Sequence, residues 1–135
     1  MGRSLIYLDA NIVIRLVEGD AATRAPLEER LAKFIGNPSS LVTSRLTRME
    51  CLVKPLRIGD LLTVSQFEVF FNGMELKIIE ISSGVIELAT RLRAVYNIKT
   101  PDAIHLASAI ETSASCFLTG DQSLANCREV PVEII

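Results

Sequence analysis

Short apolar segments alternate with helical patterns along this chain, and this alternation constrains the fold more than any other feature. The apolar segments lie at residues 4–8, 40–43, 76–81, 116–118 and 132–135. Helical spacing of apolar residues fills the intervals, at 11–17, 23–35, 44–53, 61–71, 83–95 and 100–110. Strands separated by helices need crossover connections, which are right-handed and leave the strands parallel. We therefore expect an α/β protein, a three-layer α/β/α sandwich with a central parallel sheet.

Local signals mark the ends of several predicted helices. The Gly-Asn-Pro sequence at 36–38 predicts a stop for the second helix. Ser44 is a residue type that caps helix starts, and Pro55 should end or bend the helix that follows it. The Thr-Pro pair at 100–101 has the form of a cap followed by a first helical position.

Length and composition favour one domain with an aliphatic core. The chain has 135 residues, of which 49% are hydrophobic and 5% aromatic, with no Trp. A chain of this length buries enough apolar surface to fold without disulfide or metal cross-links. We therefore expect a single domain over residues 1–135, with Ile, Leu, Val and Ala as its main core residues.

The N-terminus and the cysteines indicate an intracellular protein. The first apolar run reaches Asp9 only four residues after Ser4, which is too short for a signal peptide or a membrane span. The three cysteines are Cys51, Cys116 and Cys127, an odd number without the close spacing of zinc or redox motifs. We expect a soluble cytoplasmic protein with reduced, buried thiols.

Four acidic residues stand at strand-to-helix switches, unlike the acids in the middle of predicted helices. Asp9 follows the first strand and Glu50 lies on the helix after the second. Asp102 begins the helix before the fourth strand, and Asp121 follows that strand. In parallel sheets, ligands bind beyond the carboxyl ends of the strands, where the strand order reverses. All four carboxylates are therefore expected to converge at this edge.

Converging carboxylates repel one another unless they share a cation. Magnesium is the natural choice because it prefers oxygen ligands and is often held by a few carboxylates together with substrate phosphates. Manganese is expected to substitute. With a phosphodiester as substrate, such a metal activates a bound water for hydrolysis.

Each acid also has a purely structural explanation. Asp102 and Asp121 lie at helix starts, where caps and the helix dipole favour acids. Glu50 precedes Lys54 by four residues, the favoured orientation for a surface ion pair. Asp9 is the hardest to explain this way, because a charged residue directly after a buried strand more often marks a site.

Three other polar residues lie near these acids in the sequence. Asn11 is a candidate for orienting a carboxylate or a metal-bound water, or is simply the polar start of a helix. Thr119 is a candidate partner for Asp121 or a phosphate, or merely ends its strand. His105, the single histidine, follows Asp102 by three residues, but a lone histidine on an apolar helix is more often packed and hydrogen-bonded than catalytic.

The formal charge of −2 does not exclude a nucleic-acid partner. If four of the sixteen acids surround a metal ion, twelve remain against fourteen basic residues. The segment 45–57 is the most basic and contains one acid, Glu50. It is a candidate phosphate-binding surface or a solvated helix face.

Four motifs stand in a family order. They are Leu8-Asp9-Ala10-Asn11, Arg48-Met49-Glu50, Thr100-Pro101-Asp102-Ala103-Ile104-His105-Leu106-Ala107 and Leu118-Thr119-Gly120-Asp121. This order resembles the PIN domain of VapC-like toxins over essentially the whole chain. The resemblance implies a PIN-like, Rossmann-like topology and a magnesium-dependent endoribonuclease with Asp9, Glu50, Asp102 and Asp121 as its acidic cluster. It also implies a homodimer and a small antitoxin protein that occludes the site.

Other functions remain as alternatives. A receiver-like magnesium-binding module would carry paired acids early and a lysine near its last strand, which this sequence lacks. A haloacid-dehalogenase-like phosphatase would have a second Asp where Asn11 stands. A structure-specific DNA nuclease would carry additional helical clamps. A non-catalytic PIN fold used only for binding stays open, although all four acids are present.

Overall fold

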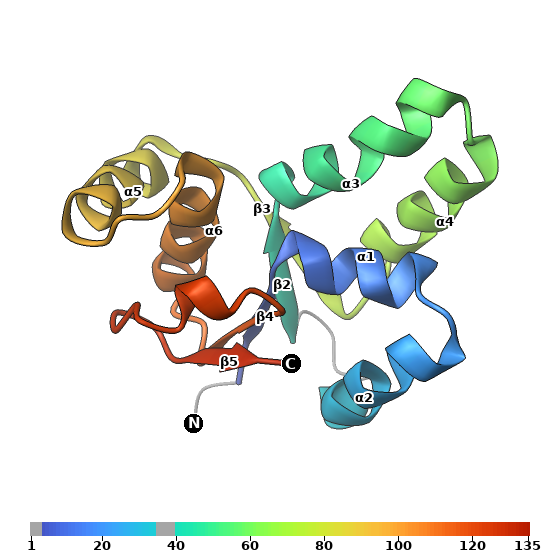
Figure 1. The fold of residues 1–135 in the computed structure, drawn as a ribbon, viewed down its shortest axis with the longest axis horizontal. Coiled ribbons are helices and arrows are strands. Elements are labelled where there is room, and N and C mark those ends of the chain that lie inside the picture. Colours follow the sequence, from blue (N-terminus) through green and yellow to red (C-terminus); the bar gives the residue numbers. More distant parts are fainter. Residues whose placement is uncertain (1–3, 35–39) are drawn as a thin grey trace.

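The central sheet of the computed structural model, which describes residues 4–34 and 40–135, has five parallel strands (Figure 1). The strands are β1 (Ile6–Leu8), β2 (Leu41–Ser44), β3 (Leu76–Ile79), β4 (Cys116–Thr119) and β5 (Val132–Ile134). Their order is β3-β2-β1-β4-β5, and every neighbouring pair runs parallel. The predicted parallel sheet is confirmed.

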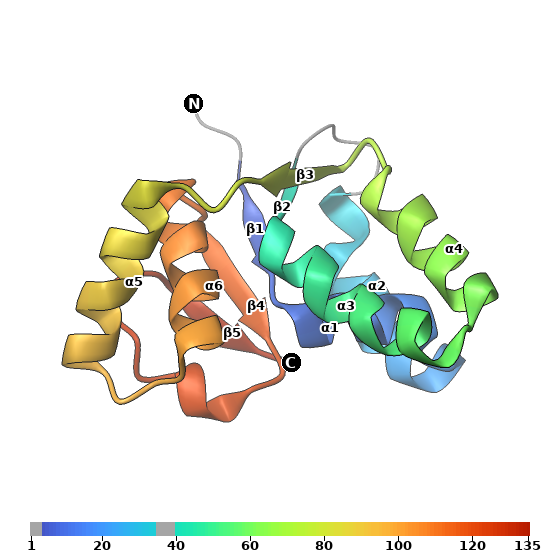
Figure 2. The ribbon, with the colours of Figure 1, turned by 90° about the horizontal axis from the view of Figure 1, so that it is seen from above.

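Helices cover both faces of this sheet. The α-helices are α1 (Ala10–Glu18), α2 (Ala21–Leu31), α3 (Arg45–Ile58), α4 (Leu61–Phe71), α5 (Ser83–Val95) and α6 (Thr100–Glu111), and two short 3-10 helices are η1 (Ala32–Phe34) and η2 (Gln122–Leu124). Figure 2 shows α5 and α6 on one side of the sheet and α1 to α4 on the other. The three-layer α/β/α sandwich is confirmed.

Alternating side chains of the strands build two cores. In β1, Ile6 and Leu8 belong to the core beneath α1 to α4. Tyr7, between them, belongs to the core beneath α5 and α6. Side chains of a strand point to opposite faces in turn, and both faces are covered, so all three residues are buried. Coverage of both faces is the reason why the sequence of β1 shows no alternation of apolar and polar residues.

The strand order reverses between β1 and β4. From β1 the chain moves outward through β2 to β3, then crosses back to β4 and continues to β5. At the carboxyl ends of this central pair, the backbone N–H of Asp9 donates to the carbonyl of Leu118 over 3.1 Å. A point where the strand order reverses is where an open parallel sheet accommodates a ligand.

Helix ends differ from the predictions in two places. Pro55 does not end α3, which continues to Ile58 and stops at Gly59, whose φ of +72° is left-handed. The proline has no N–H to donate to the carbonyl four residues before it, so it removes one intrahelical hydrogen bond, and the helix still continues to Ile58. Lys99 rather than Thr100 is the N-cap of α6. The predicted stop at 36–38 lies outside the described residues.

The three cysteines are free and buried, as predicted. Burial raises the pKa of Cys51 to about 12 and that of Cys116 to about 11, with nearby carboxylates adding to both shifts. None of the helices within residues 4–34 and 40–135 combines the length and apolar character needed to cross a membrane.

Candidate functional site at the carboxyl edge of the sheet

Asp9 lies at the centre of the carboxyl edge, between β1 and α1. It is the N-cap of α1, and its Oδ1 accepts a hydrogen bond from the backbone N–H of Ala10 over 2.8 Å. Its Oδ2 accepts from Thr119 Oγ1 at 2.8 Å and from Asn11 Nδ2 at 3.1 Å. The residue is only 4% exposed, so these three donors replace the water that a carboxylate needs.

Asn11 and Thr119 connect Asp9 to the loop after β4. Oδ1 of Asn11 accepts from the backbone N–H of Gly120 over 2.8 Å, and Oγ1 of Thr119 accepts from that of Asp121 over 3.0 Å. Asp121 caps η2, with its Oδ1 accepting from Ser123 N at 2.9 Å and Ser123 Oγ at 2.7 Å. The two supporting residues from the sequence therefore bind both neighbouring strand ends.

Glu50 reaches the same edge from α3. Its Oε1 lies 2.6 Å from Nε2 of His105, and that nitrogen is 3.7 Å from Oδ1 of Asp9. Glu50 makes no ion pair with Lys54 within the part of the chain that the structure describes. The surface ion pair with Lys54, which would have explained Glu50 without a function, is therefore not formed.

Tyr7 is a polar member of this region that sequence reasoning did not single out. Its hydroxyl lies 2.9 Å from Nδ1 of His105 and donates to Ser44 Oγ over 2.9 Å. Burial raises the pKa of Tyr7 far above its usual range, so the hydroxyl stays protonated. Ser44 precedes α3 but makes no side-chain cap bond. One signal in the sequence could have identified Tyr7. Its hydroxyl is a polar group within an otherwise apolar strand, and Asp9 directly follows that strand.

Asp102 stands in the first turn of α6 and is partly buried. Partial burial raises the pKa of its carboxyl, and the negative charges of Asp9, Asp121 and Glu50 raise it further. His105 opposes this shift in part. The charge of Asp102 is therefore influenced by three carboxylates from distant parts of the sequence.

The donor set of this acidic cluster, defined as Asp9, Glu50, Asp102 and Asp121, has the chemistry of a hard-cation site. Carboxylate oxygens are the ligands that Mg²⁺ prefers, and no ion pair among the described residues joins any of the four to an Arg or Lys. As the side chains stand, no three His, Cys, Asp or Glu groups of the described chain are arranged to share a metal ion. Two of the four are engaged by neighbours instead: Glu50 contacts His105, and Asp121 accepts from Ser123.

Two of the four basic residues in the segment 45–57, which lies in α3, are paired with acids. Nε of Arg45 lies 2.9 Å from Oε2 of Glu80, and Nη2 of Arg48 lies 2.6 Å from Oε1 of Glu68. These contacts cancel two of the four positive charges that make the segment basic. For Arg45 and Arg48, a solvated helix face is therefore a better interpretation than a phosphate-binding surface.

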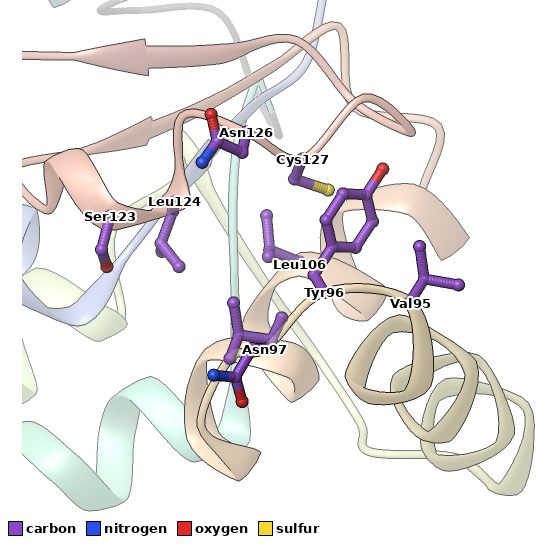
Figure 3. A pocket seen from close by; sticks show the side chains of 9 residues that line it. Val95, Tyr96, Asn97, Leu106, Ser123, Leu124, Asn126 and Cys127 are labelled. Carbon is purple, nitrogen blue, oxygen red and sulfur yellow. The ribbon is translucent and has the colours of Figure 1, made fainter.

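A pocket of about 300 Å³ lies beside the cluster, between α6 and the loops around α5 and η2 (Figure 3). Its lining residues are Val95, Tyr96, Asn97, Ile98, Leu106, Ser123, Leu124, Asn126 and Cys127. Ser123 belongs to both places, since it also binds Asp121. No carboxylate lines the pocket, so the acids lie outside it.

Comparison with known proteins gives a family and several similar structures. The family model described as PIN domain matches residues 6–130. A toxin–antitoxin complex from Klebsiella pneumoniae is 27% identical, with 94% of this chain and 95% of that chain covered at a TM-score of 0.68. VapBC2 from Rickettsia felis, bound to a DNA fragment from its promoter, is 18% identical with a TM-score of 0.76, covering 96% of this chain and 97% of that one.

A further similar structure is VapC20 of Mycobacterium tuberculosis, described as a toxin that cleaves the sarcin-ricin loop. It is 20% identical, covers 93% of this chain and 98% of that chain, and has a TM-score of 0.65. A search of curated proteins found no significant match.

Proposed function

This chain belongs to the PIN-domain family, and on that premise we propose that it is a magnesium-dependent endoribonuclease, the toxin component of a toxin–antitoxin pair. The observation that carries the proposal is the position of Asp9: its Oδ1 lies 3.7 Å from the His105 nitrogen that also contacts Glu50, and its Oδ2 binds Thr119, which accepts from the backbone of Asp121. Asp102 belongs to the same group, because the charges of Asp9, Asp121 and Glu50 raise the pKa of its carboxyl. These acids come from four separate motifs, at the edge where the strand order reverses. We also propose that residues 1–135 act as one domain.

The residues that would hold the cation are Asp9, Asp102 and Asp121, with Glu50 at the side of the cluster. Mg²⁺ bound there supplies an activated water and offsets negative charge on a scissile phosphodiester, and Mn²⁺ is expected to substitute. The protein's own contribution is orientation. Asn11 and Thr119 hold one oxygen of Asp9 through two hydrogen bonds, which keeps this carboxylate from turning toward its neighbours.

The proposed partners are RNA, a cognate antitoxin protein and a second copy of the chain. The VapC20 structure is described as a sarcin-ricin loop cleaving toxin, and the Klebsiella structure as a toxin–antitoxin complex. Both span more than nine-tenths of this chain. A cytoplasmic location agrees with these partners.

RNA cleavage tests the proposal most directly. Purified, antitoxin-free protein is incubated with a mixed pool of structured and single-stranded RNA and with Mg²⁺, Mn²⁺ or EDTA. We expect cleavage with either metal, none with EDTA, and none from folded Asp9→Asn or Asp102→Asn protein. Glu87→Gln is the matched control, since Glu87 is an exposed acid of α5 outside the cluster.

The alternative function is a non-catalytic or receiver-like magnesium-binding module. It predicts Mg²⁺ binding without cleavage of any RNA in the pool. Binding of Mn²⁺ that disappears in Asp9→Asn, together with intact RNA under every condition, favours this alternative. The absence of any metal binding removes both functions.

A further inference from the structure

We infer that His105 is a positioning residue, which holds the carboxylate of Glu50 beside Asp9 and is itself held by Tyr7 and Ser44. The inference rests on the proposed function, because Glu50 gains a role only if the acidic cluster binds a cation. It assigns a task to three residues that the acidic cluster does not include.

The position of Nε2 is the first argument. This nitrogen lies 2.6 Å from Oε1 of Glu50 and 3.7 Å from Oδ1 of Asp9. Two carboxylates from different elements, α3 and the end of β1, therefore face one ring nitrogen. The contact at 2.6 Å fixes Oε1 of Glu50 on the side of the cluster where Asp9 lies.

The fixed orientation of the ring is the second argument. Nδ1 of His105 is 2.9 Å from the Tyr7 hydroxyl, which donates to Ser44 Oγ over 2.9 Å. The ring of Tyr7 stacks on Phe117 with centroids 5.3 Å apart and planes 8° apart. Tyr7 and Phe117 are fully buried, and Ser44 begins the turn into the helix that carries Glu50. The ring cannot turn away from Glu50 without breaking this buried chain.

The accessibilities of the two partners are the third argument. The side chain of His105 is 2% exposed and that of Glu50 is 32% exposed. A half-exposed glutamate has several rotamers, and tying one oxygen to a buried ring removes most of that freedom. With both ring nitrogens engaged and no path to solvent, His105 acts through Glu50 rather than on a substrate. Mutation of a residue that hydrogen-bonds a metal ligand typically lowers metal affinity or activity by about 10- to 100-fold.

The test measures the Kd for Mn²⁺ by titration followed by electron paramagnetic resonance, which does not depend on cleavage. His105→Asn retains a polar group near Nδ1 for Tyr7 but loses the contact with Glu50. His105→Gln places an amide near Nε2 and retains it. We expect His105→Asn to weaken Mn²⁺ binding about tenfold and His105→Gln to restore most of the affinity.

A second background separates positioning from general damage to the core. In Glu50→Gln protein, we expect the additional change His105→Asn to have no further effect on the Kd for Mn²⁺. The reason is that His105 acts through the carboxylate of Glu50, which this protein lacks. If His105→Asn does not fold, Tyr7→Phe takes its place, since it removes one hydroxyl and keeps the stacked ring. A several-fold weaker affinity in that variant is the expected result.

Equal affinities of wild type, His105→Asn and Tyr7→Phe, in a wild type that binds Mn²⁺ and cleaves RNA, overturn this inference alone. The same holds if His105→Asn weakens binding equally with and without Glu50. A wild type that neither binds Mn²⁺ nor cleaves RNA overturns the proposed function and this inference together.

Discussion

The hydroxyl of Thr119, the last residue of β4, donates to Oδ2 of Asp9, the residue after β1, over 2.8 Å. The contact joins the carboxyl ends of the two strands where the sheet order reverses. The same hydroxyl oxygen accepts from the backbone N–H of Asp121 over 3.0 Å. One side chain thus sets the spacing between two acids of the cluster.

Replacing Thr119 by Val keeps the shape of this side chain and removes its hydroxyl. We expect a loss of about 1–3 kcal/mol in the free energy of unfolding, because a buried carboxylate loses one of its three donors. Cleavage should fall as well, since Asp9 is less firmly oriented. Urea unfolding measures the first effect. Thr119→Ser, which keeps the hydroxyl, is the control, and equal stabilities of Val and Ser variants would contradict the argument.

Replacing Asp102 by Asn should separate stability from activity. Partial burial and the neighbouring acids disfavour the charged form of Asp102 in the fold, as its raised pKa records. In EDTA, we therefore expect Asp102→Asn to unfold at the same urea concentration as wild type or a higher one. RNA cleavage should fall by more than about 100-fold, beyond the usual effect of outer-shell changes. A destabilised variant in EDTA would argue against carboxylate crowding.

The Arg30–Glu133 pair connects α2 to β5 through two hydrogen bonds of 2.6 and 2.8 Å. Its partners are 26% and 36% exposed, so solvent screening limits the expected loss in Glu133→Gln to about 0.5–1 kcal/mol. Arg30 lowers the pKa of Glu133. The stabilisation is therefore complete above the ordinary glutamate pKa of about 4.3 and disappears as the pH falls through the lower folded value.

Urea unfolding of wild type and Glu133→Gln at neutral pH and at decreasing acid pH checks this dependence. The difference between the two proteins should shrink toward low pH. A difference that grows on acidification would show that the sign is wrong.

Gly59 ends α3 with a φ of +72°. A Cβ added there meets no atom within 4 Å, so the cost of Gly59→Ala comes from the backbone alone. We expect a loss of about 1–2 kcal/mol in thermal or urea unfolding. Gly59→Asn should lose less, because Asn accepts left-handed geometry more readily. Equal losses would indicate a contact instead of a backbone preference.

The cysteines should react slowly with a thiol reagent in the native protein. With the pKa of Cys51 near 12 and that of Cys116 near 11, few thiolates exist at pH 8. Addition of Ellman's reagent should release little colour until denaturant exposes all three thiols. Rapid reaction of one thiol under native conditions would contradict its burial.

The local pattern of apolar residues was sufficient to predict the three layers of the fold and to place the site at the carboxyl edge of the sheet. Apolar runs without alternation identified strands covered on both faces, and alternation of strands with helices identified parallel crossovers. Asp9 could be placed at the carboxyl edge because it directly follows such a run. Helix ends were harder to predict, as Pro55 shows, because a proline inside a helix removes one hydrogen bond and can bend the helix without ending it.

The side-chain arrangement of the site depends on contacts between distant segments. Glu50 has Lys54 four residues away in the sequence, yet the fold turns it to His105, which is 55 residues away. Tyr7 looks like an ordinary strand residue until β1 and α6 are brought together.

The sequence by itself determined which segments form the sheet and which four acids stand near its strand-to-helix switches, since both follow from local periodicity and order along the chain. Only the tertiary structure decided that Thr119 and Asn11 would bind Asp9, and that His105 would contact Glu50 with one ring nitrogen and the buried Tyr7 with the other. The physical reason is that a hydrogen bond forms only when the distance between donor and acceptor lies within a range of a few tenths of an ångström. Strand register and helix packing together set that distance.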